Sequence, residues 1–219
     1  MNHYVITIAR QYGSGGRTIG ENLARKLGIA YYDKNIIKLA SDDSGINPQL
    51  FGRVDEYTSA PRPLFGAKSG TYSKEVLPPE SRLFTSDENL FNYQAKAIRE
   101  LAETEDCVII GRCANLILNS ADYPNVLRVY IHASWDFRMK DAAEKMSGTP
   151  KELEKFMKND DRRKYDLCQR FIGKEWDDPA YYDLYLDTSK LGKQAVQDEI
   201  ERRYLKLRKK GTGVPDGSV

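Results

Sequence analysis

The chain has 219 residues, of which 40% are hydrophobic and 30% are charged, and its formal net charge is +2. This length and composition predict one globular domain that can bury a core, and the near-neutral charge argues against a general nucleic-acid-binding protein. No apolar run approaches the roughly 18 residues that a membrane span needs, so we expect no membrane association.

The cysteines and histidines lack the spacing of a disulfide framework or a zinc site. They are Cys107, Cys113 and Cys168, with His3 and His132. The first apolar stretch, residues 4–9, is too short for the hydrophobic core of a signal peptide. We therefore expect a cytoplasmic protein in a reducing compartment, without structural disulfides.

Short apolar segments alternate along the chain with segments of helical periodicity. Strands are expected at 4–8, 29–32, 107–111, 127–131 and 182–186. Helices are expected at 19–27, 34–39, 86–104, 134–147, 150–171 and 192–209. This alternation is typical of an α/β fold with a five-stranded parallel sheet and helical crossovers.

Residues 1–210 are predicted to form a single domain. Within it, residues 42–85 have a mixed composition, and 59–82 are rich in proline and glycine. We expect 59–82 to be a loop or mobile insertion with few core contacts. Residues 211–219 are predicted to be a disordered tail.

A glycine-rich segment lies between the first predicted strand and the first predicted helix. It comprises Gly13, Ser14, Gly15, Gly16, Arg17 and Thr18. At a helix N-terminus, backbone N–H groups and the helix dipole attract anions, and glycine lets a phosphate approach the backbone closely. The segment is therefore predicted to bind phosphate, and the alternative is a tight turn without a ligand.

This segment departs from the phosphate-loop pattern G-x-x-x-x-G-K-[ST]. When its glycines are aligned with that pattern, Gly16 stands at the lysine position and Arg10 at the first glycine position. Arg17 is the predicted replacement cation for the transferring phosphate. Thr18 is the predicted source of the hydroxyl that reaches Mg²⁺.

Four segments in this order resemble the cytidylate kinase-like proteins, relatives of the nucleoside monophosphate kinases. They read ITIARQYGSGGRTIG, LGIAYYDKNII, VIIGRCAN and YLDTSKLG. The resemblance implies a three-layer P-loop NTPase-type core with ATP and Mg²⁺ as cofactors. It also implies a helical lid, expected at about 158–178, and an acceptor-side insertion at about 42–85.

The resemblance also suggests roles for charged residues beyond the loop. Arg112 is expected to grip the acceptor phosphate, unless it only caps a strand at the surface. Asp33 is expected to contact the acceptor nucleoside or a metal-bound water, although a turn or helix N-cap aspartate is an equal alternative. Arg162 and Arg163 of the lid are expected to stabilise the transition state, and the alternative is a solvated helix face.

The expected function is ATP-dependent phosphoryl transfer to a nucleoside monophosphate, with CMP or dCMP as the first candidate. One alternative is a nucleotide-binding regulatory protein with weak or no kinase activity, and another is a kinase of a different small molecule. The expected partners are nucleotide substrates, without nucleic acid or membrane. The sequence does not indicate an oligomeric state.

Overall fold

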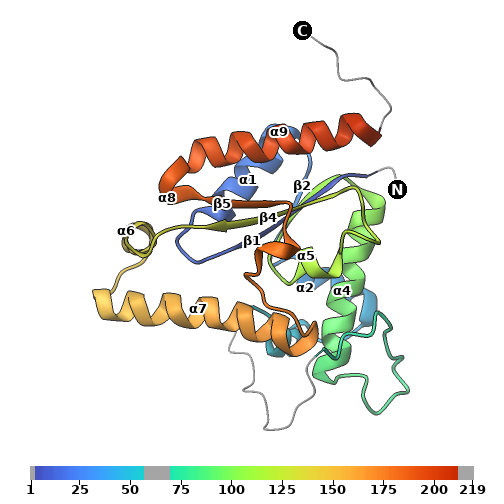
Figure 1. Cartoon of the computed structure of the whole chain (residues 1–219). Helices are drawn as coiled ribbons and strands as arrows, with labels where there is room; N and C mark the ends of the chain where they lie inside the picture. The colour runs from blue at the N-terminus through green and yellow to red at the C-terminus, as the bar shows by residue number, and fades with distance from the viewer. Residues whose placement is uncertain (1–2, 57–69, 212–219) are drawn as a thin grey trace.

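A computed structural model describes residues 3–56 and 70–211 (Figure 1). Its centre is a five-stranded parallel sheet with the strand order β2-β3-β1-β4-β5. The strands are β1 Val5–Arg10, β2 Ala30–Tyr32, β3 Cys107–Ile110, β4 Val126–His132 and β5 Leu184–Asp187. The predicted α/β fold with five parallel strands is therefore confirmed.

Helices cover both faces of the sheet. They are α1 Gly16–Leu27, α2 Ile36–Ser44, α3 Pro48–Phe51, α4 Asp87–Thr104, α5 Ala114–Ile117, α6 Trp135–Lys145, α7 Pro150–Phe171, α8 Thr188–Leu191 and α9 Lys193–Gly211, with 3-10 turns η1 Gly52–Val54 and η2 Pro179–Tyr181. The sequence offered residues 47–57 as a further helical stretch, and α3 with η1 occupies part of it. The short helices α5 and α8 were not predicted, because one turn is too short to show a periodicity. The capping box between Thr149 and Glu152 explains why α7 begins where the sequence predicted it.

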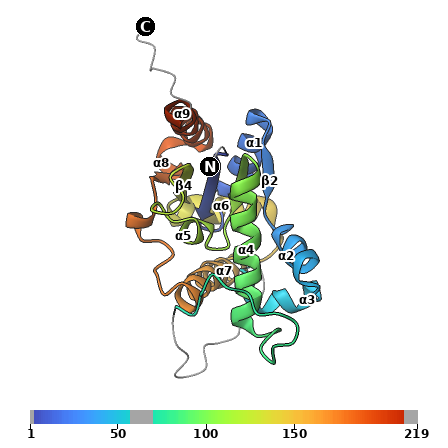
Figure 2. The ribbon, with the colours of Figure 1, turned by 90° about the vertical axis from the view of Figure 1, so that its right-hand side faces the viewer.

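The sheet separates the core into two layers, and its central strand β1 contributes side chains to both. Ile6 and Ile8 face α1 and α9, whereas Val5 and Ala9 face the layer that contains α4, α5 and the end of α7. Figures 1 and 2 show α1 and α9 together on one side of the sheet, with α4 and α7 on the other. Alternation along β1 thus commits its side chains to both layers and fixes this strand at the centre.

The direction in which successive strands are added to the sheet reverses at β1. It runs from β1 to β2 and β3 on one side, and then crosses to β4 and β5 on the other. In open α/β sheets, ligands bind beyond the carboxyl ends of the strands at such a switch point. The glycine-rich loop leaves β1 at this position, and the N-terminus of α6 lies at the same edge (Figure 1).

The described part of the predicted insertion packs against the core. Tyr72, Val76 and Phe84 contact the hydrophobic cluster. The Gly70 and Tyr72 N–H groups donate to carbonyls at the end of α7. The expectation of few core contacts is therefore wrong for residues 70–82, because Tyr72 and Val76 anchor a segment that has no regular secondary structure. Residues 57–69 and the predicted tail beyond residue 211 lie outside the described residues.

The cysteine prediction is also corrected. Cys113 and Cys168 form a disulfide between the start of α5 and the last turn of α7, with their Cα atoms 5.9 Å apart. The residues are 55 positions apart, so the sequence carried no signal of the pairing. Cys107 is a free thiol buried in β3. In the described ranges, no helix is long and apolar enough to cross a bilayer.

Candidate phosphate-binding site

The glycine-rich loop needs glycine at two of its positions. Gly13 and Gly15 have φ angles of +78° and +82°, a region that other residues rarely adopt. A Cβ atom on Gly13 would also lie 2.6 Å from the carbonyl oxygen of Arg138 in α6. The local sequence therefore allows a tight turn that packs directly against a neighbouring helix.

Side chains hold the loop in place from both sides. The Tyr12 N–H donates to Oδ1 of Asp161 at 2.9 Å, and Nε of Arg138 donates to the Tyr12 carbonyl at 2.6 Å. Arg138 and Asp161 also form an ion pair with each other. The hydroxyl of Ser14, which is fully buried, donates to the Gln11 carbonyl at 2.9 Å. These contacts fix the loop, and its last three residues form the start of α1, which begins at Gly16.

A cavity of about 420 Å³ opens in front of the loop. It is lined by Arg10, Gln11, Tyr12, Gly13, Gly15, Gly16, Arg17, Thr18, Lys34, Asp141, Lys145, Phe156, Asp160, Arg163 and Lys164. Of the residues predicted for the site, this wall brings together the three glycines with Arg17, Thr18 and Arg163. Ser14 is not part of this wall, and its buried hydroxyl bonds to the Gln11 carbonyl.

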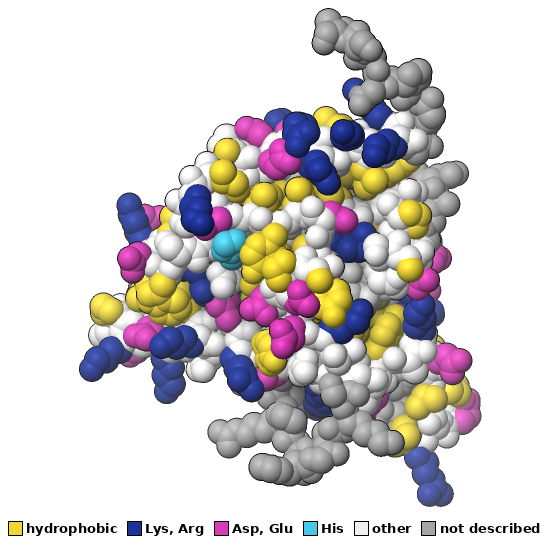
Figure 3. Space-filling view, in the orientation of Figure 1, with side chains coloured by type: hydrophobic (Ala, Val, Ile, Leu, Met, Phe, Trp, Pro, Cys, Tyr) yellow, Lys and Arg dark blue, Asp and Glu magenta, His cyan; other side chains and the backbone are white. Residues whose placement is uncertain are grey.

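The cavity carries an excess of positive charge. Its cationic residues are Arg10, Arg17, Lys34, Lys145, Arg163 and Lys164, against the two acids Asp141 and Asp160. On the face in Figure 3, basic and acidic side chains are interspersed, with basic groups along α9 and α7. The cationic excess in front of the glycine loop is suited to an anion with several charges.

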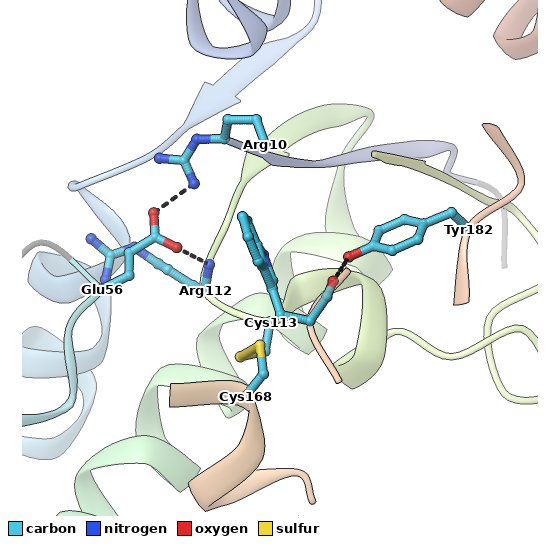
Figure 4. Close-up of a disulfide and its surroundings, with 7 residues drawn as sticks. Arg10, Glu56, Arg112, Cys113, Cys168 and Tyr182 are labelled. Carbon is cyan, nitrogen blue, oxygen red and sulfur yellow. Dashed lines mark hydrogen bonds and ion pairs between the residues drawn. A yellow bond between two sulfur atoms is a disulfide. The ribbon is translucent and has the colours of Figure 1, made fainter. Parts of the chain in front are cut away.

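A buried group of charges includes the wall residues Arg10, Asp160 and Lys164 and continues behind the wall to Glu56 and Arg112. Nη1 of Arg10 lies 2.7 Å from Oε1 of Glu56, and the Arg112 N–H donates to Oε2 of the same carboxylate at 2.9 Å (Figure 4). Lys164 forms an ion pair with Asp160 one turn earlier on α7. These side chains are almost fully shielded from solvent, so their mutual attraction is screened far less than that of a surface pair.

The pKa values in this group follow from burial and charge. Burial alone would raise the pKa of Glu56, but attraction to Arg10, Lys164 and Arg112 lowers it to about 2. Burial lowers the pKa of Lys164, and repulsion from Arg10 lowers it further. Glu56 is therefore ionised at any physiological pH, and it holds cations together that would otherwise repel one another.

The structure places Asp33 and Arg112 differently from the loop residues. Oδ2 of Asp33 lies 2.8 Å from Nε of Arg17, so the buried aspartate positions that arginine. The fully buried Arg112 binds Asp55 through Nη1 at 2.8 Å and donates from Nε to the Asp33 carbonyl at 3.1 Å. Arg112 is neither a surface cap nor part of the cavity wall, so its predicted grip on an acceptor phosphate has no support in this arrangement.

The predicted lid is the C-terminal half of the continuous helix α7 and the chain that follows. Arg163 faces the cavity, and its Nε donates to the Glu56 carbonyl at 3.3 Å. Its neighbour Arg162 is exposed and pairs with Asp166 at 2.7 Å. The two arginines that the sequence grouped together therefore lie on different faces of α7.

Sequence reasoning missed Glu56, Asp160 and Lys164 as parts of the site. Asp160 and Lys164 belong to the charge run of the predicted lid, for which a solvated helix face was the alternative, yet both are buried. Their spacing of four residues, with both facing the same side of a helix, was the available signal. Glu56 carried no local signal, because its partners lie far away in the sequence.

The residues at this site fit a hydrated Mg²⁺ ion that is held mainly by phosphate oxygens. The exposed Thr18 lies on the cavity wall and offers a hard oxygen ligand. Asp141 is engaged by Lys145 at 2.7 Å and by Lys193 at 2.5 Å. Within the described residues, no cluster of three or more acidic, histidine or cysteine side chains could hold a metal by itself.

Comparison with known proteins identifies similar solved structures and a family. A solved uncharacterized protein from Eubacterium ventriosum is 22% identical, covers 92% of this chain and 98% of its own, and has a TM-score of 0.65. Shikimate kinase from Bacteroides thetaiotaomicron is 11% identical, covers 91% and 97%, and has a TM-score of 0.49. A search of curated proteins found no match. The model of the cytidylate kinase-like family matches residues 5–190, and the chain therefore belongs to that kinase-like family.

Proposed function

We propose that the protein transfers a phosphoryl group from ATP to a small-molecule acceptor. The observation that carries the proposal is the cationic cavity in front of the glycine loop between β1 and α1. A loop of this kind suits a polyphosphate, because backbone N–H groups and the helix dipole act together with the side-chain cations. Membership of the cytidylate kinase-like family supports the same chemistry.

Phosphoryl transfer asks little covalent chemistry of a protein. Its rate depends on holding donor and acceptor in line, and on positive charge around the transferring group. In this chain, Gly13, Gly15 and Gly16 would seat the donor phosphates, while Arg17 and Arg163 face the same space. Mg²⁺ would neutralise phosphate charge when bound, with Thr18 as its protein ligand.

CMP or dCMP is the first acceptor to test, because the family is cytidylate kinase-like. The acceptor of such a reaction already carries an ionised phosphate, so no strong general base is needed. Arg17, held by Asp33 at 2.8 Å, is a cation at the β2 side of the cavity, where the acceptor would lie. A different phosphorylated or hydroxylated acceptor remains the second candidate.

An ADP-release assay separates these possibilities. The protein is incubated with Mg·ATP and a panel of nucleoside monophosphates, and the phosphorylated product is identified by mass spectrometry. Product formed with CMP or dCMP supports the nucleotide kinase, whereas product formed only with another acceptor moves the assignment to a different small-molecule kinase. ATP binding without turnover on any acceptor supports the regulatory alternative, and absence of ATP binding contradicts the proposal.

A further inference from the structure

Two departures from the phosphate-loop pattern meet in space. A Cβ atom built on Gly16 would lie 2.7 Å from the Cβ atom of Arg10 and 3.4 Å from the Cβ atom of Ile131. Real Cβ atoms do not approach each other to 2.7 Å, so position 16 cannot carry a side chain while Arg10 keeps this place. The absence of a side chain at Gly16 is therefore coupled to the presence of a side chain at Arg10.

The Arg10 guanidinium is fixed next to the loop. It is almost fully buried, lines the cavity and pairs with Glu56 at 2.7 Å. A Cβ atom on Gly111, which has a φ angle of +69°, would run into both Nη1 of Arg10 and the Glu56 carboxylate. Glycine at position 111 thus leaves the space that this ion pair occupies.

Glu56 is itself held in position by the chain around it. Its second oxygen accepts the Arg112 N–H at 2.9 Å, and its carbonyl accepts Nε of Arg163 at 3.3 Å. One oxygen of Glu56 therefore remains directed at Nη1 of Arg10, as Figure 4 shows. A guanidinium carries five N–H donors in a planar fork. The ion pair with Glu56 therefore orients the Arg10 guanidinium, and Arg10 still lines the cavity where a phosphate would bind.

We infer that Arg10 supplies, from the end of β1, the phosphate-binding cation that the lysine supplies in an ordinary phosphate loop, and that Gly16 leaves the room for its side chain. This inference rests on the proposed function, because it concerns the same donor site. Glu56 is the positioning residue of this arrangement. Lys164, buried beside it on α7, adds a second positive charge to the wall.

Burial favours Arg10 over Arg17 as this cation. The Arg17 side chain is 54% exposed and its Nε faces Asp33. A cation in contact with water interacts more weakly with a phosphate than one on a shielded wall. Arg17 then serves the acceptor side of the cavity, and Arg10 serves the donor phosphates.

A reciprocal exchange tests the inference. The variants are R10G, G16K and the double variant R10G/G16K, which restores the ordinary pattern of glycine and lysine. Dissociation constants for Mg·ATP, inorganic tripolyphosphate and adenosine are measured by calorimetry on the full chain. Each single variant is expected to weaken ATP and tripolyphosphate at least 10-fold, and the double variant is expected to recover most of that loss. Adenosine binding is expected to change less than threefold, because adenosine carries no phosphate.

Two further variants separate binding from folding. R10K keeps a cation against Glu56 and is expected to retain most ATP affinity, with an unchanged unfolding transition. R10G/E56Q removes both charges of the buried pair, so loss of ATP binding in a folded R10G/E56Q protein is assigned to the missing cation. R17A is the comparison for the competing cation.

The outcomes are distinct. The inference is overturned if R10G and R10G/E56Q bind tripolyphosphate as the parent does, or if R17A alone abolishes donor binding. It is also overturned if G16K binds ATP normally beside an intact Arg10, because the two side chains would then not compete for space. A parent protein that binds neither ATP nor tripolyphosphate contradicts the proposed function itself, together with this inference.

Discussion

The disulfide between Cys113 and Cys168 fastens the end of α7 to the loop that follows β3 (Figure 4). Lys164, on the cavity wall, lies one helical turn before Cys168, and Arg112 directly precedes Cys113. The bond therefore links the helix that carries Asp160, Arg163 and Lys164 to the strand end that holds Glu56. The link adds a covalent constraint to contacts, such as that of the Tyr12 N–H with Asp161, that place α7 beside the glycine loop.

Reduction of this disulfide is expected to destabilise the protein. A cross-link between residues 55 positions apart lowers the entropy of the unfolded chain by an amount worth about 4 kcal/mol. The oxidised protein should therefore melt roughly 10 °C above the reduced one. Differential scanning calorimetry with and without reductant measures this shift, and C107A, which removes a buried thiol outside the bond, should show the same reductant effect as the parent. Equal melting temperatures with and without reductant would contradict a stabilising bond.

The charge on Glu56 is expected to stabilise the fold above acidic pH. Its pKa is lowered from 4.5 to about 2 in the folded state, which corresponds to about 3 kcal/mol. A lowered pKa means that this stability is present above pH 4.5 and is lost as the pH falls towards 2. Urea unfolding of the parent and E56Q should therefore differ most at neutral pH and converge as the pH is lowered. A constant difference from pH 7 to pH 3 would show that the charge is not the cause.

Replacement of Arg112 is expected to lower the stability of the fold and not specifically the affinity for the acceptor. The R112A variant leaves Asp55 without its 2.8 Å ion pair and removes the Nε bond to the Asp33 carbonyl in a fully buried place. Removing one partner of a buried pair costs about 3–5 kcal/mol, so the urea midpoint should fall substantially. If R112A instead unfolds like the parent and raises only the acceptor KM, Arg112 is an acceptor ligand as the sequence suggested.

Alanine variants of the neighbouring Arg162 and Arg163 on α7 are expected to lower kcat/KM for ATP to different extents. Arg163 lines the cavity and contacts Glu56, whereas Arg162 points to solvent and pairs with Asp166. R163A should lower kcat/KM for ATP by roughly 10-fold or more, because a cation facing the transferring phosphate is lost. R162A should cause a smaller loss, and K158A, an exposed lysine paired with Glu154, serves as the surface control. Equal losses in R162A and R163A would contradict the assignment of faces.

Much of the fold was predictable from local pattern. Continuous β-branched strands and helical periodicity indicated the five strands and the long helices, since burial on both faces of a parallel sheet leaves a direct trace in the sequence. The glycine loop was equally readable, because a left-handed turn before a helix demands glycine at specific positions such as Gly13 and Gly15. The packing of Tyr72 and Phe84 was not predictable, because a segment without regular structure shows no period.

The sequence by itself determined the parallel α/β sheet, the position of the glycine loop in it, and the absence of a lysine at Gly16. Only the tertiary structure decided which cations face the loop, that Arg162 and Arg112 do not line the cavity, and that Cys113 meets Cys168. The reason is physical: electrostatic attraction and disulfide formation depend on distance and burial in space. Arg10, Glu56 and Lys164 come from β1, from the chain after η1 and from α7, and only the folded chain brings them together.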